Sequence, residues 1–183
     1  MAEKILRHTK DSIFMETSKL LNSTLNIDEL LDIILDLNAK AMEAQASSLL
    51  LIDRRRGELE FYVSKEAKRR KKLSLKMGEG IAGWVAEHKK PVISNEVKKD
   101  YRYSPQLEEQ IGFSIDSLIC VPLLRRGNLI GVATVLNKLD GKKFDQADMD
   151  IFLSLADQIA IALDNSYLYR KAKKKTLEKY KAM

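Results

Sequence analysis

The sequence predicts an α+β fold, with an antiparallel sheet of about six strands covered on one face by helices from both ends of the chain. Two observations carry this prediction. Helical periodicities occupy the two ends of the chain, and short apolar runs separated by turn residues fill the middle. An order of helices, then strands, then a long helix is typical of α+β proteins, in which helices gather on one side of an antiparallel sheet.

Length and composition limit the class of protein. The 183 residues are 45% hydrophobic and 32% charged, which suits one globular domain with a buried core. No apolar run reaches the ~18 residues of a transmembrane helix, and the N-terminus carries no secretory signal. The single cysteine, Cys120, excludes an intramolecular disulfide and argues against a cysteine-based zinc site. We expect a cytoplasmic protein.

The net charge of +6 does not indicate a nucleic-acid-binding protein. Residues 170–183 hold seven cations and one acid, which accounts for the whole excess. A second basic segment, 65–72, is a short loop. Neither segment is interleaved with the aromatic residues that stack on bases. We therefore expect solvated charge, with no direct nucleic-acid partner and no membrane partner.

Two helices are predicted before the strands. The first spans about residues 3–22. The second starts at Asn26, where Glu29 three residues later completes a pattern like a capping box. Its apolar residues recur with the spacing of one helix face: Leu30, Ile33, Ile34, Leu37 and Ala41.

The middle of the chain predicts short strands. The expected strands are 47–52, 59–63, 73–76, 91–93, 117–124 and 129–138. The last two form a hairpin around residues 125–128. A short helix is expected from Ser104 to Gly112, with serine at the cap and Pro105 in the first turn.

Three glycines, Gly78, Gly80 and Gly83, have the G-x-G-x-x-G spacing of a dinucleotide-binding loop. That motif needs a buried parallel strand before it and an acid at the end of a second strand about twenty residues later. Here the preceding strand is short and amphipathic, and Asp100 lies in a polar turn. We interpret the glycines as the start of a short helix that packs closely on the sheet.

The stretch from Gly127 to Asp148 defines a turn, a β-branched strand, a polar loop and the start of the last helix. That helix is predicted to begin at Asp145 and to carry apolar residues at helical spacing. They are Phe152, Leu155, Ala156, Ile159, Ala162, Leu163 and Ser166.

Four segments together resemble a GAF domain over about residues 26–170. They are Ser48-Leu-Leu-Leu-Ile-Asp53, Gly80-Ile-Ala-Gly83-Trp-Val-Ala86, Ser117-Leu-Ile-Cys-Val-Pro-Leu123, and Gly131-Val-Ala-Thr-Val-Leu-Asn-Lys138 running to Phe144. The last is similar to the Asn-Lys, Phe, Asp-Glu signature in GAF domains of cyclic-nucleotide phosphodiesterases and adenylyl cyclases. This chain has Asn137, Lys138, Phe144 and Asp148, with Met149 in place of the glutamate.

The resemblance implies a six-stranded sheet of GAF/PAS-like architecture with a ligand pocket on the face opposite the terminal helices. The implied pocket residues are Ser48, Leu50, Tyr62, Ser64, Ile81, Ala82, Trp84, Tyr103, Ile115, Ser117 and Thr134. It also implies that Asn137, Lys138, Phe144 and Asp148 form a structural latch, in which Lys138 and Asp148 pair and do not touch ligand. Loop 95–104 is expected to close over the ligand.

The ligand class stays open among a cyclic nucleotide, another small anionic metabolite and no ligand. The helix start at Ile81-Ala82 suits an anionic group. The Phe-Asp pair that family members place near the base aligns to Ser64-Lys65, and the acid sometimes found before Asn-Lys is Thr134. The helix start that suits an anion is therefore retained, while the residues that would select a purine base are not. We expect no cofactor.

The resemblance also implies a homodimer formed through the terminal helices. The expected dimer face of the last helix is Phe152, Leu155, Ile159, Ala162, Ser166 and Tyr169. We expect the chain to divide into an N-terminal dimer-forming helix (1–22), the GAF domain (23–166) and a signalling helix or linker (167–183). Ligand would favour one packing of the paired helices, and an output domain would respond. The expected parent is a bacterial signalling protein, and we favour an enhancer-binding transcription activator.

No catalytic or metal site is expected. GAF relatives that reduce methionine sulfoxide use several cysteines, and Cys120 alone cannot form the required disulfide. His8 and His88 are far apart, and no carboxylate spacing completes a metal site around them. The alternative function is a ligand-free dimerisation module of a sensor kinase or cyclic-di-nucleotide enzyme. Its pocket would be filled by Leu50, Phe113 and Ile115.

Overall fold

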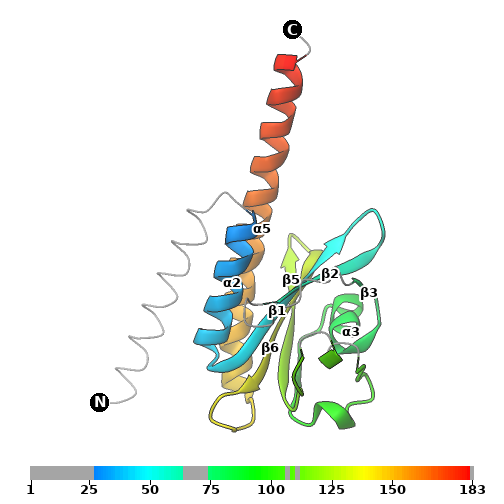
Figure 1. Cartoon of the computed structure of the whole chain (residues 1–183), viewed down its shortest axis with the longest axis vertical. Helices are drawn as coiled ribbons and strands as arrows, with labels where there is room; N and C mark the ends of the chain where they lie inside the picture. The colour runs from blue at the N-terminus through cyan, green and yellow to red at the C-terminus, as the bar shows by residue number, and fades with distance from the viewer. Residues whose placement is uncertain (1–26, 64–73, 106–107, 110–111, 182–183) are drawn as a thin grey trace, which may run out of the picture.

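The computed structural model describes residues 27–63, 74–105, 108–109 and 112–181 (Figure 1). Its helices are α2 (Ile27–Ala41), α3 (Gly80–His88), the 3₁₀ turn η1 (Val97–Lys99) and α5 (Gln146–Lys181). Its strands are β1 (Ala44–Asp53), β2 (Glu58–Val63), β3 (Ser74–Lys76), β4 (Val92–Ser94), β5 (Leu118–Arg125) and β6 (Asn128–Lys138). The predicted N-terminal helix and basic loop lie outside the described residues, as does part of the helix expected at 104–112.

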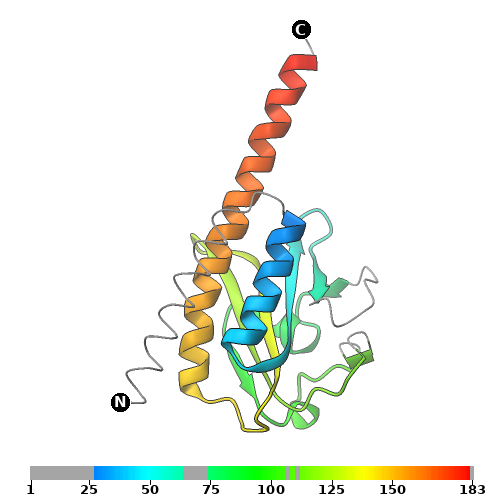
Figure 2. The same ribbon diagram turned by 60° about the vertical axis from the view of Figure 1, so that its left-hand side comes forward.

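The six strands form one sheet in the order β3-β2-β1-β6-β5-β4, and every pair of neighbouring strands is antiparallel. The helices α2 and α5 lie side by side on one face, and α3 lies on the other (Figures 1 and 2). The predicted α+β class and six-stranded antiparallel sheet are therefore confirmed.

The centre of the sheet is the β1–β6 pair, which is covered on both faces. Strand β6 is fully buried from Val132 to Leu136 because its β-branched and apolar side chains alternate between two cores. Gly131 marks the closest approach of the two strands. A Cβ atom there would lie 2.2 Å from the Leu50 carbonyl oxygen, so only glycine fits.

The helix face of the sheet holds the larger core. Helix α2 buries four leucine and isoleucine side chains against β1 and α5: Leu30, Leu31, Ile34 and Leu35. The centre of this buried stripe is shifted by one position from that of the predicted stripe. The hydroxyl of Ser47 donates to the Leu35 carbonyl oxygen at 2.6 Å and ties β1 to α2.

The predicted dimer face of α5 is wrong for five of its six residues. Phe152, Leu155, Ile159, Ala162 and Ser166 are each less than 5% exposed, and the four apolar ones belong to the core under α2 and β5. They cover the chain's own sheet and are not available to a second copy. Only Tyr169, which is 45% exposed, lies on the surface. Past the sheet, α5 continues as a single projecting helix (Figure 1).

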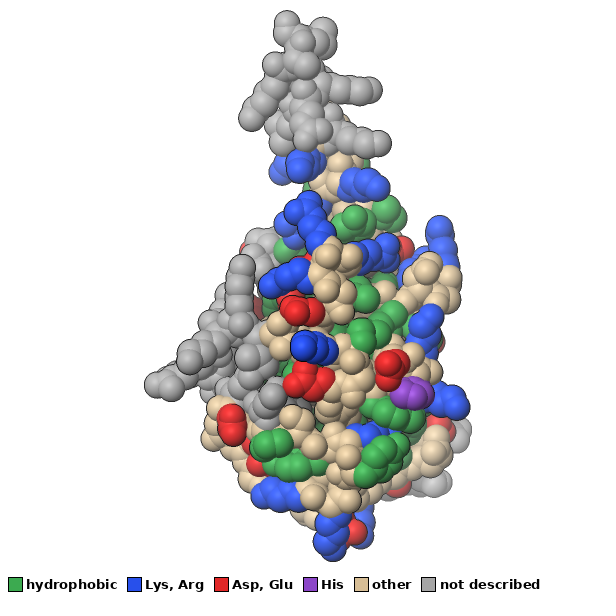
Figure 3. Space-filling view, turned by 90° about the vertical axis from the view of Figure 1, so that its right-hand side faces the viewer, with side chains coloured by type: hydrophobic (Ala, Val, Ile, Leu, Met, Phe, Trp, Pro, Cys, Tyr) green, Lys and Arg blue, Asp and Glu red, His purple; other side chains and the backbone are tan. Residues whose placement is uncertain are grey.

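The opposite face, which we call the pocket face, carries a smaller core beneath α3, η1 and the loops between β4 and β5. Its outer surface shows hydrophobic side chains in small groups scattered among charged ones (Figure 3). Within the described part of the chain, no helix combines the length and apolar character needed to cross a bilayer.

Candidate ligand pocket

A small cavity lies on the pocket face between the sheet and α3. Its volume is about 30 Å³. The described residues that line it are mostly apolar: Leu75, Gly80, Ile81, Ala82, Val97, Tyr103, Ser104, Ile115, Leu118, Cys120 and Thr134. The cavity holds about two waters at most and is far below the ~300–1,000 Å³ of a typical ligand site.

The first turn of α3 forms one wall of the cavity. Gly78 and Gly80 have φ angles of +82° and +66°, which let the chain turn sharply into the helix. Gly83 lets the helix sit against β3, since a Cβ atom there would lie 2.7 Å from the Lys76 carbonyl oxygen. The glycine pattern therefore serves close helix packing, as expected. The backbone N–H groups of this first turn lack partners within the helix and suit an anion.

A pair of buried hydroxyls forms the floor. Ser48 of β1 and Thr134 of β6 are direct cross-strand neighbours, and their side-chain oxygens lie 2.5 Å apart in a hydrogen bond. Thr134 lines the cavity, and both residues are at most 1% exposed. Thr134 is thus a polar group placed to contact a bound molecule at the floor of an otherwise apolar cavity.

Cys120 lines the same cavity but is not poised for nucleophilic chemistry. Its side chain is fully buried in β5, and this burial raises the pKa of its thiol well above the ordinary range. The thiolate is the nucleophilic form, so a neutral buried thiol is unreactive. Among the described residues, no group of three or more histidine, cysteine, aspartate or glutamate side chains could hold a metal ion.

An ion pair braces the rim of the pocket face. The Arg102 guanidinium donates two 2.8 Å hydrogen bonds to the Asp100 carboxylate, and the two side chains are 15% and 9% exposed. These bonds hold the pKa of Asp100 below its usual value. Arg102 also lies 4.7 Å from the centre of the Trp84 ring, which stacks on His88 at 4.2 Å. Trp84 therefore packs outside the cavity, in contrast to its predicted place in the pocket.

The structure brings together five of the predicted pocket residues: Ile81, Ala82, Tyr103, Ile115 and Thr134. Ser48 and Leu50 are buried on the same face beside the cavity. The prediction is wrong for Tyr62, which packs on the helix-face core because neighbouring strand residues point to opposite faces. It is also wrong for Ser117, whose backbone pairs with Asn137. Ser64 lies outside the described residues.

Six lining residues were not predicted: Leu75, Gly80, Val97, Ser104, Leu118 and Cys120. Strand alternation in 118–121 was a usable signal for two of them, because Leu118 and Cys120 share the face of Thr134. Val97 and Ser104 had no such signal, since the loops that carry them have no regular periodicity.

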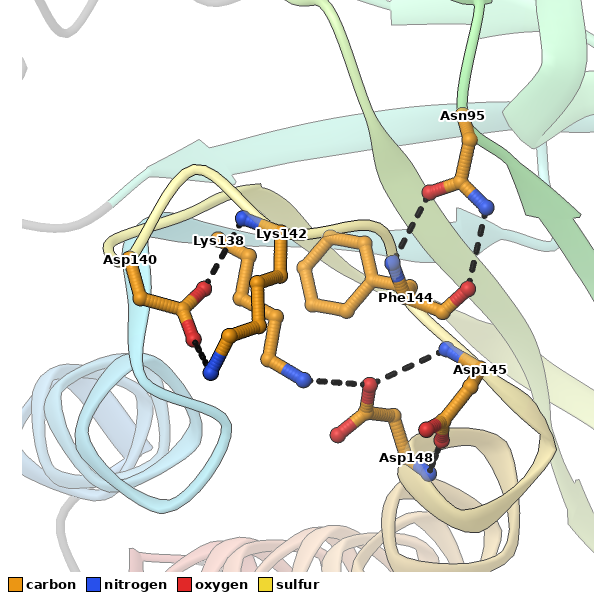
Figure 4. Close-up of polar contacts among 7 residues, drawn as sticks. All are labelled: Asn95, Lys138, Asp140, Lys142, Phe144, Asp145 and Asp148. Atoms are coloured by element: carbon orange, nitrogen blue, oxygen red, sulfur yellow. Dashed lines mark hydrogen bonds and ion pairs between the residues drawn. The ribbon is translucent and has the colours of Figure 1, made fainter.

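The stretch from Asn137 to Asp148, which we call the corner, joins β6 to α5. The expected ion pair is present, with the Lys138 ammonium 2.6 Å from a carboxylate oxygen of Asp148 (Figure 4). The same oxygen accepts the Asp145 N–H, and Asp145 in turn accepts the Asp148 N–H. This reciprocal arrangement is a capping box, so Asp148 both starts α5 and holds it to β6.

Asn137, which was predicted as part of the latch without a named partner, holds the segment before β5. It adopts a left-handed φ of +52°, and its side chain bonds residues that precede β5. It therefore acts on the loop before β5.

Burial alone would lower the pKa of Lys138, but its hydrogen bond to Asp148 and the nearby acids outweigh this and raise the pKa. The ammonium stays charged at neutral pH.

Comparison with known proteins places these features in a family. A family model described as GAF domain matches residues 24–164. The probable 3′,5′-cyclic phosphodiesterase pde-5 of Caenorhabditis elegans is 26% identical over 185 residues, which cover 94% of this chain and 25% of that protein. The dual 3′,5′-cyclic-AMP and -GMP phosphodiesterase 11 of Drosophila melanogaster is 36% identical over 96 residues, covering 52% of this chain and 7% of that protein.

A solved structure supports the fold. The GAF domain of a phosphoenolpyruvate-protein phosphotransferase from Coxiella burnetii superimposes with a TM-score of 0.77 at 22% identity. The match covers 88% of this chain and 96% of that domain. By contrast, this chain spans a quarter or less of the two phosphodiesterases. The similarity to those proteins concerns one part of each of them.

Proposed function

The chain belongs to the GAF domain family, and from that premise we propose that it senses a small ligand on the pocket face and reports binding through α5. The observation that carries the proposal is the cavity between α3 and the sheet, with a helix N-terminus on one side and Thr134 at its floor. A small apolar cavity with a helix N-terminus at one wall and a buried hydroxyl at its floor suits a small molecule.

Under this proposal, the cavity widens when a ligand binds. Its free space of about 30 Å³ is too small for a nucleotide, so binding requires the wall residues Val97, Tyr103 and Ile115 to move outward. All three lie on the loops between β4 and β5, and none belongs to a central strand. A ligand that binds only the open arrangement shifts the population toward it.

A cyclic nucleotide is the first candidate ligand. Its support is the similarity to proteins named cyclic phosphodiesterases, together with the first turn of α3, whose N–H groups suit a phosphate. Thr134 is a neutral residue, so the floor offers a hydroxyl to the base and no carboxylate. Small anionic metabolites form the second class because they meet the same helix terminus.

The output is proposed to pass through α5 to a further domain, for which an enhancer-binding transcription activator is our candidate. The support is the projection of α5 beyond the sheet in Figure 1. The proposal includes a homodimer, with its contact moved to the exposed Tyr167, Leu168 and Tyr169. Sedimentation of the chain and of a Leu168→Lys variant tests this; a monomer in both cases contradicts it.

The binding experiment is a titration calorimetry series with cyclic AMP, cyclic GMP, 5′-AMP and 5′-GMP. We expect one cyclic nucleotide to bind and its linear counterpart to bind at least about tenfold more weakly. Ala82→Leu should abolish binding, because Ala82 lines the cavity and a leucine would fill it. The matched control is Ala147→Leu on the exposed first turn of α5, which should bind as the parent does. No heat with any of the four nucleotides contradicts the cyclic-nucleotide assignment.

A ligand-free module is the second candidate, because Leu50 and Ile115 are buried in the core of the pocket face and Phe113 packs against it. Under this alternative, a thermal-shift screen of nucleotides and small organic anions gives no response. Ala82→Leu then raises the unfolding temperature and leaves the oligomeric state unchanged.

A further inference from the structure

We propose that two asparagines, Asn95 and Asn137, are positioning residues that couple the pocket wall to the start of α5. The coupling deepens the proposed sensory function and rests on it for its biological meaning. Its physical basis is two side-chain amides: that of Asn95, two residues before the wall residue Val97, bonds the corner, and that of Asn137, in the corner, bonds the segment that holds the wall residue Ile115.

Asn95 follows β4 and reaches across to the residue that precedes the helix cap. Its Nδ2 donates to the Phe144 carbonyl oxygen at 2.9 Å, and its Oδ1 accepts the Phe144 N–H at 2.9 Å (Figure 4). The amide therefore uses both backbone groups of one residue, much as a neighbouring strand would. A side-chain amide supplies this donor and this acceptor on two separate atoms, whereas an ionised carboxylate of the same shape cannot donate.

Phe144 transmits that contact to the helix face. Its ring is 3% exposed and belongs to the core formed with α2 and α5. The next residue, Asp145, is half of the capping box that starts α5. A displacement of Asn95 therefore moves Phe144, whose side chain lies in the helix-face core and whose backbone directly precedes the helix cap.

The other end of this connection is the pocket wall. Val97 lies two residues after Asn95, lines the cavity and is 2% exposed. Its N–H donates to the Asp116 carbonyl oxygen at 3.1 Å, which joins it to the second part of the wall. Ile115, adjacent to Asp116, also lines the cavity and is 1% exposed.

Asn137 holds this second part. Its Oδ1 accepts the N–H groups of Asp116 at 2.9 Å and Ser117 at 3.2 Å. Its Nδ2 donates to the Ser114 carbonyl oxygen at 2.8 Å and to Gln45 at 2.9 Å. Every hydrogen-bonding position of the amide is used, and its neighbour Lys138 pairs with Asp148.

The two parts of the wall are thus tied to the same corner by independent amides. Outward movement of Val97 pulls on Asn95 and Phe144, and outward movement of Ile115 pulls on Asn137 beside Lys138. Both routes reach the first turn of α5. These contacts couple the wall to α5 only if the wall and the first turn of α5 change conformation together. The strength of that coupling is a free energy that can be measured.

The decisive experiment needs no ligand. Val97→Ala perturbs the wall in the full chain and in an Asn95→Ala chain, and amide hydrogen exchange is followed by NMR at Asp148 and Met149. We expect Val97→Ala to raise exchange at these amides by about threefold or more in the parent. In the Asn95→Ala background the further increase should be less than about 1.5-fold, since the connection from this part of the wall to Phe144 is already broken.

Controls separate coupling from general loosening. Lys142→Ala changes the same loop, where Lys142 pairs with Asp140 (Figure 4), and should preserve the full response to Val97→Ala. Exchange at Leu49 in β1 should change little in any variant. If Asn95→Ala does not fold, Asn95→Asp keeps the acceptor for the Phe144 N–H, loses the donor, and should give a partial response. Equal responses in both backgrounds, or equal acceleration at Leu49, would overturn the coupling.

A second arm uses 1 mM cyclic GMP and 1 mM cyclic AMP as probes. Binding should alter exchange at Asp148 in the parent and alter it clearly less in Asn95→Ala, where only the Asn137 connection remains, even where calorimetry shows that the nucleotide still binds. If neither probe binds, the cyclic-nucleotide assignment fails while the ligand-free arm still decides the coupling. A bound probe that moves Asp148 exchange equally in both chains overturns the coupling alone.

Discussion

The two faces of the sheet are built from the same strands but covered in different ways. On the helix face, α2 and the 36-residue α5 place regular stripes of apolar side chains on β1 and β5. On the pocket face, the nine-residue α3, the η1 turn and irregular loops form a smaller core that leaves a cavity. Regular helices interdigitate closely with a sheet, whereas loops cover it at points fixed by individual polar contacts.

This difference separates stability from response. The helix face is filled by buried apolar side chains and therefore loses packing energy wherever one of them is shortened. The pocket face is held by individual polar contacts, such as those of Asn95, Asn137 and Arg102, and under the proposed function it adopts a second arrangement at lower cost than the helix face would. A domain that senses ligands needs both kinds of face, joined at one place, and the corner joins them.

The largest expected effect compares one substitution on each face. Ile159→Ala on α5 should lower the free energy of unfolding by about 3–5 kcal/mol, and Ile115→Ala beside the cavity by about 2–3 kcal/mol. Both isoleucines are buried, at 2% and 1% exposure. The loop around Ile115 can collapse into the space, whereas the helix cannot. Urea unfolding measures both values, and an equal or larger loss for Ile115→Ala contradicts the contrast.

The next effect concerns the ion pair at the rim. Asp100→Asn should lower stability at neutral pH by about 1–3 kcal/mol, because it weakens two charge-assisted hydrogen bonds from Arg102. The pKa of Asp100 is lowered in the fold, so the pair contributes fully above the ordinary value of 3.8 and is lost as the pH falls through the folded pKa.

Thermal unfolding between pH 7 and pH 2 tests this sign. The parent should lose stability more steeply than Asp100→Asn in the acid range below about pH 4. Parallel curves for the two chains would show that Asp100 contributes nothing to the acid dependence.

A smaller effect is expected at the corner. Lys138→Met should cost about 1 kcal/mol, since the ion pair is 13% and 16% exposed and Asp148 keeps the Asp145 N–H. The matched control, Lys142→Met, breaks a pair whose lysine is 77% exposed and should change stability by less than about 0.5 kcal/mol. Urea unfolding of both variants gives the comparison, and equal losses would remove the special role of Lys138.

The smallest effect concerns how readily each face of the sheet opens to solvent, with the native cysteine as the probe of the pocket face. Alkylation of Cys120 should be at least about a hundredfold slower than that of an exposed thiol, because the side chain is fully buried and the pKa is raised. A Cys120→Ser, Ala160→Cys chain places an equally buried thiol on the helix face. It should react more slowly still, and equal rates would show that both faces open together.

Much of the fold could be predicted from local patterns. Alternation and β-branched runs located all six strands to within a few residues, and helical periodicity located α2 and α5. The polar residues of the corner were also visible, because Asn137, Lys138, Phe144 and Asp148 form a spaced signature. Even so, the partner of Asn137 was missed, since Ser114 and Asp116 lie more than twenty residues away in a loop.

The candidate site was only half predictable. Residues on strands and on α3 follow a period, so Ile81, Ala82 and Thr134 could be assigned to the pocket face. Loop residues such as Val97 and Ser104 follow none. The dimer face failed for a related reason, because an apolar stripe on α5 gives no sign of whether the chain's own sheet or a second copy will cover it.

The sequence by itself therefore determined the class of fold, the strand boundaries and the chemistry of the corner, because those depend on local periodicity and on residue types at short spacing. The tertiary structure alone decided which face of α5 is buried, how little room the pocket has, and that Asn95 meets Phe144 across 49 positions of the chain. These features depend on contacts between distant segments, and no local pattern encodes such contacts.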